Sequence, residues 1–148
     1  MKNQEYGIFR TAIYFVILLL VCPSFFMFGT SQVDGSSVSD HMKAINRGLR
    51  ELRRQVDDTD KTEANLALIA EVRKQVKGAQ KGAPSKTSSL SEAERGPFLE
   101  AFRALLDEVI LTLNELETAV KEGRLEDASA LVKKLNEHKK QGHDKFQD

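Results

Sequence analysis

Residues that cross-link a chain or interrupt its helices are scarce in this sequence. Among its 148 residues there are three prolines, two tyrosines and a single cysteine, Cys22. One cysteine excludes a disulfide within the chain and leaves no thiolate cluster for a structural metal. Because few β-branched runs occur outside the N-terminus, helix is favoured over strand. We therefore expect a helical protein that is held together by apolar packing.

The sequence also lacks an excess of charge of either sign. It carries 22 basic and 22 acidic residues, so its formal net charge is zero. Proteins that bind nucleic acids usually show a basic stripe or a high pI, and we expect no nucleic-acid partner here. The acidic residues never occur in the Glu-x-x-His pairs from which the two-metal sites of helical bundles are built. A site of that kind is not expected.

Long apolar runs are missing except near the N-terminus. Residues 11–28 read TAIYFVILLLVCPSFFMF and follow a short segment with Lys2 and Arg10. This pattern is typical of a secretory signal peptide. An uncleaved anchor is the alternative, because about 18 apolar residues can span a bilayer. We expect residues 1–31 to be a signal peptide or a membrane anchor, and the remainder to lie in the periplasm, with membrane contact only if the segment is uncleaved.

The rest of the chain has an apolar residue at nearly every third or fourth position. After a polar linker, residues 32–40, four such stripes cover residues 41–56, 66–79, 98–120 and 125–146. This spacing places the apolar side chains on one face of each helix. The long polar segment 81–97 includes Ser91-x-x-Glu94, which can form a capping box. Because short connections join antiparallel neighbours, residues 41–147 are predicted to form an all-α, antiparallel up-down-up-down four-helix bundle.

The predicted topology brings chemically distinctive side chains to one end of the bundle. Met42 begins the first helix, Phe98 and Phe102 begin the third, and His143 ends the fourth. On a helical wheel with about 100° per residue, Met42 and His143 lie at the inner edges of their stripes. From facing helices they could reach both sides of a flat macrocycle. Since the chain has no C-x-x-C-H motif, a haem bound there would be held without covalent bonds.

Four segments of the chain resemble the cytochrome b562 family in their order and spacing. They are DHMKAINRGLREL, ANLALIAEVRKQVKGAQKGAPSK, FLEAFRALLDEV and ALVKKLNEHKKQGHDKF, and together they extend from about Asp40 to Gln147. Each segment alone is a weak amphipathic signal, whereas their joint order is specific. Cytochrome b562 is itself a known example of the up-down four-helix bundle. The resemblance therefore implies this fold and one non-covalent b-type haem.

The resemblance also implies roles for particular residues. In the family a methionine near the start of the first helix and a histidine near the end of the fourth ligate the haem iron, and Met42 and His143 occupy those positions. Phe102 and Leu106 resemble pocket residues, and Lys139 resembles a basic residue beside the haem edge. The chain departs from the family in a longer connection before the third helix and in a leucine at 106, where an aromatic residue is expected.

These features predict a protein that carries electrons and is not an enzyme. With both axial positions filled by side chains, the iron has no open site for a substrate, and methionine ligation favours the ferrous state. The expected partners are haem and transient redox proteins. A bundle of the cell envelope that binds no haem, or that stores it, is the alternative. His41 offers a second possible ligand opposite His143, whereas His138 is predicted to lie on the surface.

Overall fold

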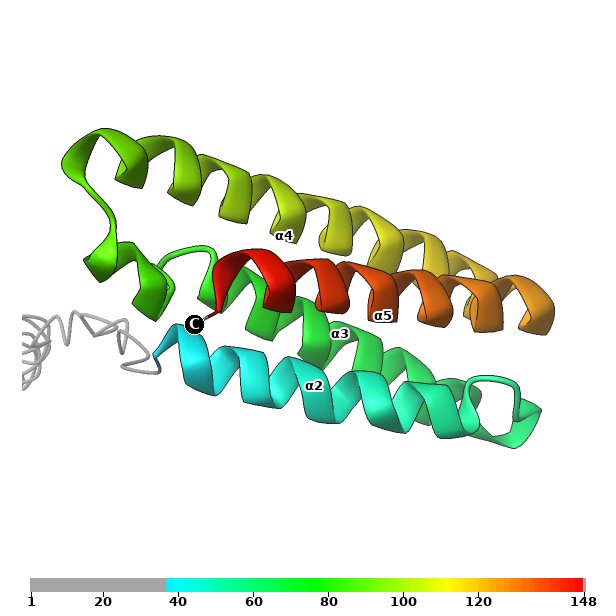
Figure 1. Cartoon of the computed structure of the whole chain (residues 1–148). Coiled ribbons are helices and arrows are strands. Elements are labelled where there is room, and N and C mark those ends of the chain that lie inside the picture. Colours follow the sequence, from blue (N-terminus) through cyan, green and yellow to red (C-terminus); the bar gives the residue numbers. More distant parts are fainter. Residues whose placement is uncertain (1–36, 148) are drawn as a thin grey trace, which may run out of the picture. The chain divides into compact units, whose positions relative to one another are not determined.

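The computed structural model describes residues 37–147, all of which belong to one compact unit. In chain order its elements are α2 (Val38–Gln55), the short 3₁₀ helix η1 (Thr59–Lys61), α3 (Thr62–Ala79), the 3₁₀ helix η2 (Ser85–Ser89), α4 (Glu92–Lys121) and α5 (Leu125–Phe146). Each long helix packs against the next, and α5 returns to α2 (Figure 1). The prediction of an all-α, antiparallel four-helix bundle is confirmed.

The start of α2 differs from the prediction by one turn. The segment predicted as a signal peptide or anchor, residues 1–31, lies outside the described residues. We predicted a linker as far as residue 40, but α2 already begins at Val38. Ser37 caps it, because its hydroxyl oxygen accepts a hydrogen bond from the backbone N–H of Asp40 at 3.2 Å. None of the helices within residues 37–147 is long and apolar enough to cross a membrane.

Helix α4 also begins earlier than its apolar stripe. The predicted capping box is present, and the backbone N–H of Ser91 donates to the Glu94 carboxylate at 3.0 Å. Hydrogen bonds from Ser91 lower the pKa of Glu94 below its ordinary value. The next residues, through Pro97, are helical yet exposed. The capping box thus starts the helix locally, and its first turns extend beyond the core (Figure 1).

The connection between α4 and α5 turns on a glycine. Gly123 has a φ of 69°, a left-handed conformation that costs glycine little and other residues more. Its N–H donates to the carbonyl of Val120 at 3.2 Å, and the N–H of Arg124 donates to that of Ala119 at 2.9 Å. These bonds satisfy the last carbonyls of α4, so α5 can turn back at once along its neighbour.

The core consists of the apolar stripes of all four helices. Leu52, Ile69, Leu113 and Leu116 are completely buried. Close to the turn between α2 and α3, the buried amide of Asn65 donates to the carbonyl of Gln55 at 3.0 Å, and the Gln55 amide donates back at 3.1 Å. Apolar packing and a satisfied polar pair therefore close this end of the bundle.

Candidate functional site

A cavity of about 560 Å³ lies at the other end of the bundle, where α2 and α4 begin and α3 and α5 end. Its volume falls within the usual range for cofactor pockets. The walls are mainly apolar side chains of α2, α4 and α5, and Val76 of α3 joins them. The connection between α3 and α4 covers the end through Ala83, Pro84 and Ser85. This is the end at which the sequence predicted a site.

The four sides of the bundle are not packed equally. α2 packs closely on α3 and α4 closely on α5, whereas the packing of α5 on α2 is the loosest. Both α2 and α5 contribute residues to the cavity lining, among them Asn46 and Leu49 of α2 and Leu135 and Lys139 of α5. The loosely packed side between α2 and α5 is therefore the natural way for a flat ligand to enter.

Met42 stands in the cavity wall. It lies in the second turn of α2, is partly buried, and packs against the hydrophobic core. The turn before it carries the Ser37 cap, and Ser37 and Ser39 also line the cavity. Hydrogen bonds from Ser37 and the neighbouring Lys43 ammonium lower the pKa of Asp40. A thioether is thus presented at the predicted place on a well-capped helix end.

His143 is exposed and is not among the described residues that line the cavity. It lies in the last turns of α5 directly after Gly142, and Lys139, Gly142 and Phe146 of the same helix segment do line the cavity. The structure therefore places Met42 at the cavity but leaves His143 beside it, on the solvent side. Because Gly142 has no side chain, nothing on that residue blocks an imidazole that leans across it.

The other residues named from the resemblance lie in the cavity wall. Phe102 is buried and Lys139 is partly buried, and both line the cavity together with Leu106. Phe146 contacts two phenylalanines edge to face, with ring centroids 5.2 Å from Phe98 and 5.3 Å from Phe102. This aromatic group closes the end of the cavity with rigid apolar surface, while Lys139 adds the one cation to its described lining.

His41 points elsewhere. It is only 6% exposed, and its Nδ1 lies 2.7 Å from the Gln75 amide oxygen of α3. Its ring packs on Gly78 so closely that a Cβ there would come within 2.4 Å of it. His41 thus fastens α2 to α3 and does not line the cavity. This placement gives no support to the alternative in which His41 replaces Met42.

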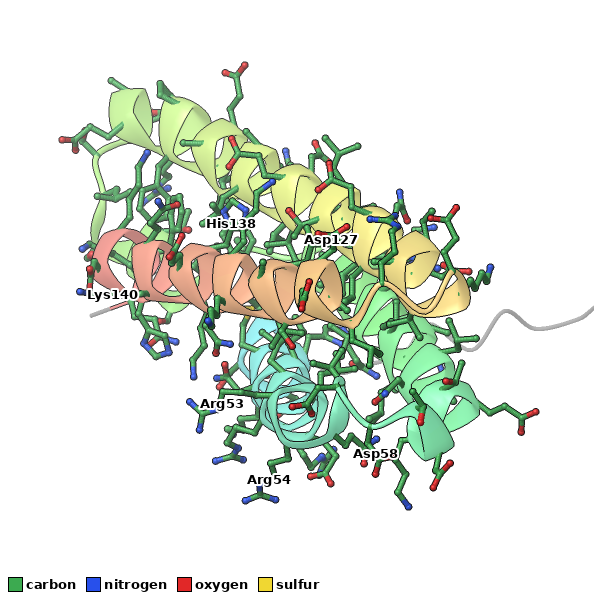
Figure 2. The ribbon with its side chains drawn as sticks, turned by 90° about the vertical axis from the view of Figure 1, so that its right-hand side faces the viewer. Arg53, Arg54, Asp58, Asp127, His138 and Lys140 are labelled. Carbon is green, nitrogen blue, oxygen red and sulfur yellow. The ribbon has the colours of Figure 1, made fainter. Side chains whose placement is uncertain are left out.

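Two polar residues of the cavity were not found from the sequence. We predicted His138 on the surface, but its side chain is only 11% exposed and lines the cavity, where α5 packs on α4 (Figure 2). Asn46, one turn after Met42, lines the same cavity, and its Oδ1 is buried without a hydrogen-bond partner. The sequence signal for Asn46 was its position four residues after Met42, which places both on one face.

The residues present suit a haem. A b-type haem needs an apolar pocket with a thioether or imidazole directed at its iron, and these are the chemical groups along the cavity. Lys139 offers a cation for an acidic substituent at the edge of the ring. Among residues 37–147, no three histidine, cysteine or acidic side chains come together in a group that could hold a metal ion.

Comparison with known proteins identifies the family of the chain. No curated protein matches the chain closely enough to count as a relative. The sequence model of one family, described as cytochrome b562, matches residues 37–147, which is all of the chain that the structure describes. That match includes all four helices and every residue of the cavity lining. The chain therefore belongs to the cytochrome b562 family.

Proposed function

We propose that this chain is a periplasmic electron-transfer protein that binds one non-covalent b-type haem, with Met42 and His143 as axial ligands. The observation that carries the proposal is the apolar cavity of about 560 Å³ with Met42 in its wall. Membership of the family implies the b-type haem. When bound, the haem supplies a ferric–ferrous couple, and the residues of this chain hold it, shield it from water and tune its potential.

Ligation by His143 requires its side chain to turn inward. His143 occupies the edge of α5 that faces the loosely packed side of the bundle, next to the cavity-lining Gly142. We propose that this imidazole is exposed without ligand and swings across Gly142 when haem enters between α2 and α5. Met42 needs no such movement. Met42 is therefore the part of the proposed site that already lines the cavity, and His143 is the part that closes it.

The surroundings of the cavity support electron transfer rather than catalysis on a substrate. Two protein ligands leave the iron no open position, and the packed Phe98, Phe102 and Phe146 exclude water from its neighbourhood. Burial in apolar surroundings and a thioether ligand both favour the ferrous state. Such a protein exchanges electrons through the ring edge at the mouth of the cavity.

The charge on α2 suggests how a redox partner docks. Four arginines of this helix are exposed: Arg47, Arg50, Arg53 and Arg54. Figure 2 shows Arg53 and Arg54 pointing from the bundle into solvent. Arg47 and Arg50 each follow a cavity-lining residue of α2, whereas Arg53 and Arg54 lie in its last turn at the other end of the bundle. An acidic partner would therefore reach the cavity wall through Arg47 and Arg50. We expect such encounters to weaken as salt is added.

Absorption spectroscopy of the full chain tests the proposal. Titration of the haem-free protein with haemin is expected to give a sharp Soret band at one haem per chain, with α and β bands that appear on reduction. The ferric protein should also show the methionine–iron charge-transfer band, and Met42→Ala should abolish it. A protein that leaves added haemin unbound would instead be a haem-free interaction bundle.

Kinetics separate an electron carrier from a haem store. A carrier is reduced and oxidised rapidly by small redox reagents and keeps its haem, whereas a store passes its haem to an apo-acceptor such as apomyoglobin. Periplasmic location is proposed from the apolar segment within residues 1–31 and its flanking Lys2 and Arg10. The mass of the protein recovered from the periplasmic fraction tests it, because an intact Met1 would exclude cleavage.

A further inference from the structure

His138 is a buried histidine of the cavity that the proposed pair of ligands does not use. It lies in α5 five residues before His143, on the edge of the helix that packs on α4 (Figure 2). His143 lies on the opposite edge, towards α2. Because α5 packs closely on α4 and loosely on α2, one imidazole is covered and the other is exposed. The cavity is thus bordered by two histidines of one helix.

The hydrogen bonds around His138 leave one ring nitrogen free. Its Nε2 lies 3.4 Å from the Thr112 hydroxyl oxygen, and that hydroxyl donates its only proton to the carbonyl of Glu108 at 3.0 Å. The hydroxyl can therefore only accept from His138, so Nε2 carries the ring proton and Nδ1 has the bare lone pair. This lone pair is buried and has no hydrogen-bond partner.

No other group satisfies this nitrogen. The Glu108 carboxylate oxygen lies 3.6 Å from Nδ1, beyond hydrogen-bonding distance, and pairs with this nitrogen only when the ring is protonated; Glu108 is 61% exposed and does not line the cavity. The contact between Nε2 and the Thr112 hydroxyl is long for a nitrogen–oxygen hydrogen bond. Rotation of the imidazole away from Thr112 therefore breaks only a weak hydrogen bond. The His138 side chain lines the cavity while its Nδ1 is turned towards Glu108, so a rotation of the ring is what would bring this unpartnered nitrogen to a ligand in the cavity.

We infer that His138 is a second imidazole ligand of this cavity, which binds the haem iron opposite Met42 when His143 does not. This inference rests on the proposed function, since it presupposes that haem enters the cavity. The two histidines compete for one axial position: His143 approaches from the open side between α2 and α5, and His138 from the covered side near α4. Removal of His143 alone therefore leaves an imidazole-ligated haem.

Three variants of the full chain test this inference. The chain has three histidines, so His138→Gln/His143→Ala leaves only His41, which is held against Gln75 away from the cavity. His143→Ala changes an exposed residue and should not disturb folding. His138→Gln keeps an amide that can donate to Thr112. Each protein is checked by circular dichroism, titrated with haemin, and its ferric form examined by electron paramagnetic resonance and visible absorption.

The inference predicts a clear order of results. His138→Gln, which keeps His143, shows how much the change in the cavity wall alone alters haemin affinity, and His143→Ala should bind one low-spin haem with an imidazole signature. The double variant should lose that signature, become high-spin and bind haemin at least about tenfold more weakly than His143→Ala. Equal spectra and affinities of His143→Ala and the double variant would overturn the inference, as would an imidazole signature that persists in the double variant. If the unchanged chain binds no haemin, it is the proposed function that fails.

Discussion

The two ends of this bundle are made from the same kinds of residue but are packed differently. At the end that holds the turns, Leu52, Ile69, Leu113 and Leu116 are completely buried. At the other end similar leucines and phenylalanines surround a cavity of about 560 Å³, and Met42 is only partly buried. We call these the closed end and the open end. Amphipathic spacing alone thus does not decide whether a bundle fills its core.

The difference has a local cause in how each end is joined. At the closed end η1 and Gly123 turn the chain within a few residues, and the Asn65–Gln55 pair fixes α2 on α3. At the open end the long connection from α3 to α4 passes over the cavity, and the first turns of α4 extend beyond the core. Helices held tightly at one end can remain apart at the other, which leaves room for a ligand there.

The largest expected effect is the loss of a leucine from the closed end. Leu113→Ala removes a completely buried side chain of α4, and the surroundings cannot collapse onto the gap. It should lower the free energy of unfolding by about 2–5 kcal/mol. Urea denaturation of the haem-free protein measures the change.

The matched control is Leu106→Ala, in the same helix at the open end. Leu106 already faces the cavity, so its removal breaks fewer contacts and should cost less than Leu113→Ala. Equal losses would mean that the open end is packed as tightly as the closed end, and the contrast between them would disappear.

Haem binding should have the next largest effect, because it fills the open end. A ligand that binds only the folded state stabilises it by about 2.7 kcal/mol at one hundred times its dissociation constant. Hydrogen exchange should slow most around Met42 in α2 and Gly142 in α5, and least near Gly123. Uniform protection along all four helices would contradict an open end that closes on its ligand.

A glycine sets the turn at the closed end. Gly123→Ala forces a side chain into a left-handed conformation at φ 69°, so it should lower the free energy of unfolding by about 1–2 kcal/mol. Gly123→Asn should cost less, since asparagine tolerates this conformation better. Thermal melting of both variants gives the comparison. Haem affinity should not change, because the cavity lies at the other end.

The sequence was a reliable guide where the structure depends on local spacing. The apolar stripes predicted the four helices and their order, and that order placed Met42, Phe102 and Lys139 at one end, where they line the cavity. The capping box of Ser91 was also recognised, and it indicated that part of the polar segment 81–97 belongs to the first turn of the next helix, as the structure shows. Local capping overcame the lack of apolar side chains in those turns.

Which histidines are buried depends on the packing between helices, and a helical wheel contains no information about that packing. The helical wheel placed His143 at the inner edge of the α5 stripe and His138 on the surface, and the structure reverses their burial. The unequal packing of α5 on α4 and α2 decides that His138 is covered and His143 exposed. His41 was considered as a second possible ligand, but its pairing with Gln75 of α3 is a contact between helices that the sequence alone does not show.

The smallest expected effect concerns an ion pair between α3 and α4. Glu117 accepts hydrogen bonds from Lys121 and Arg73, which lower its pKa below the ordinary value of 4.5. Both Glu117 and Arg73 are about three-quarters covered. Glu117→Gln keeps the shape and removes the charge, so it should lower the free energy of unfolding at neutral pH by about 0.5–1 kcal/mol.

The effect of Glu117→Gln should depend on pH in a defined direction. A carboxylate whose pKa is lowered by folding stabilises the protein above 4.5, its ordinary pKa, and loses that contribution as the pH falls through the folded pKa. Urea denaturation at pH 7 and at pH 3 should therefore show a deficit that shrinks in acid. Glu115→Gln is the control, since Glu115 is mostly exposed and 3.7 Å from Lys134. A deficit that is equally large at pH 3 would mean that it does not come from the ionised carboxylate, and the proposed contribution of the Glu117 ion pair would be wrong.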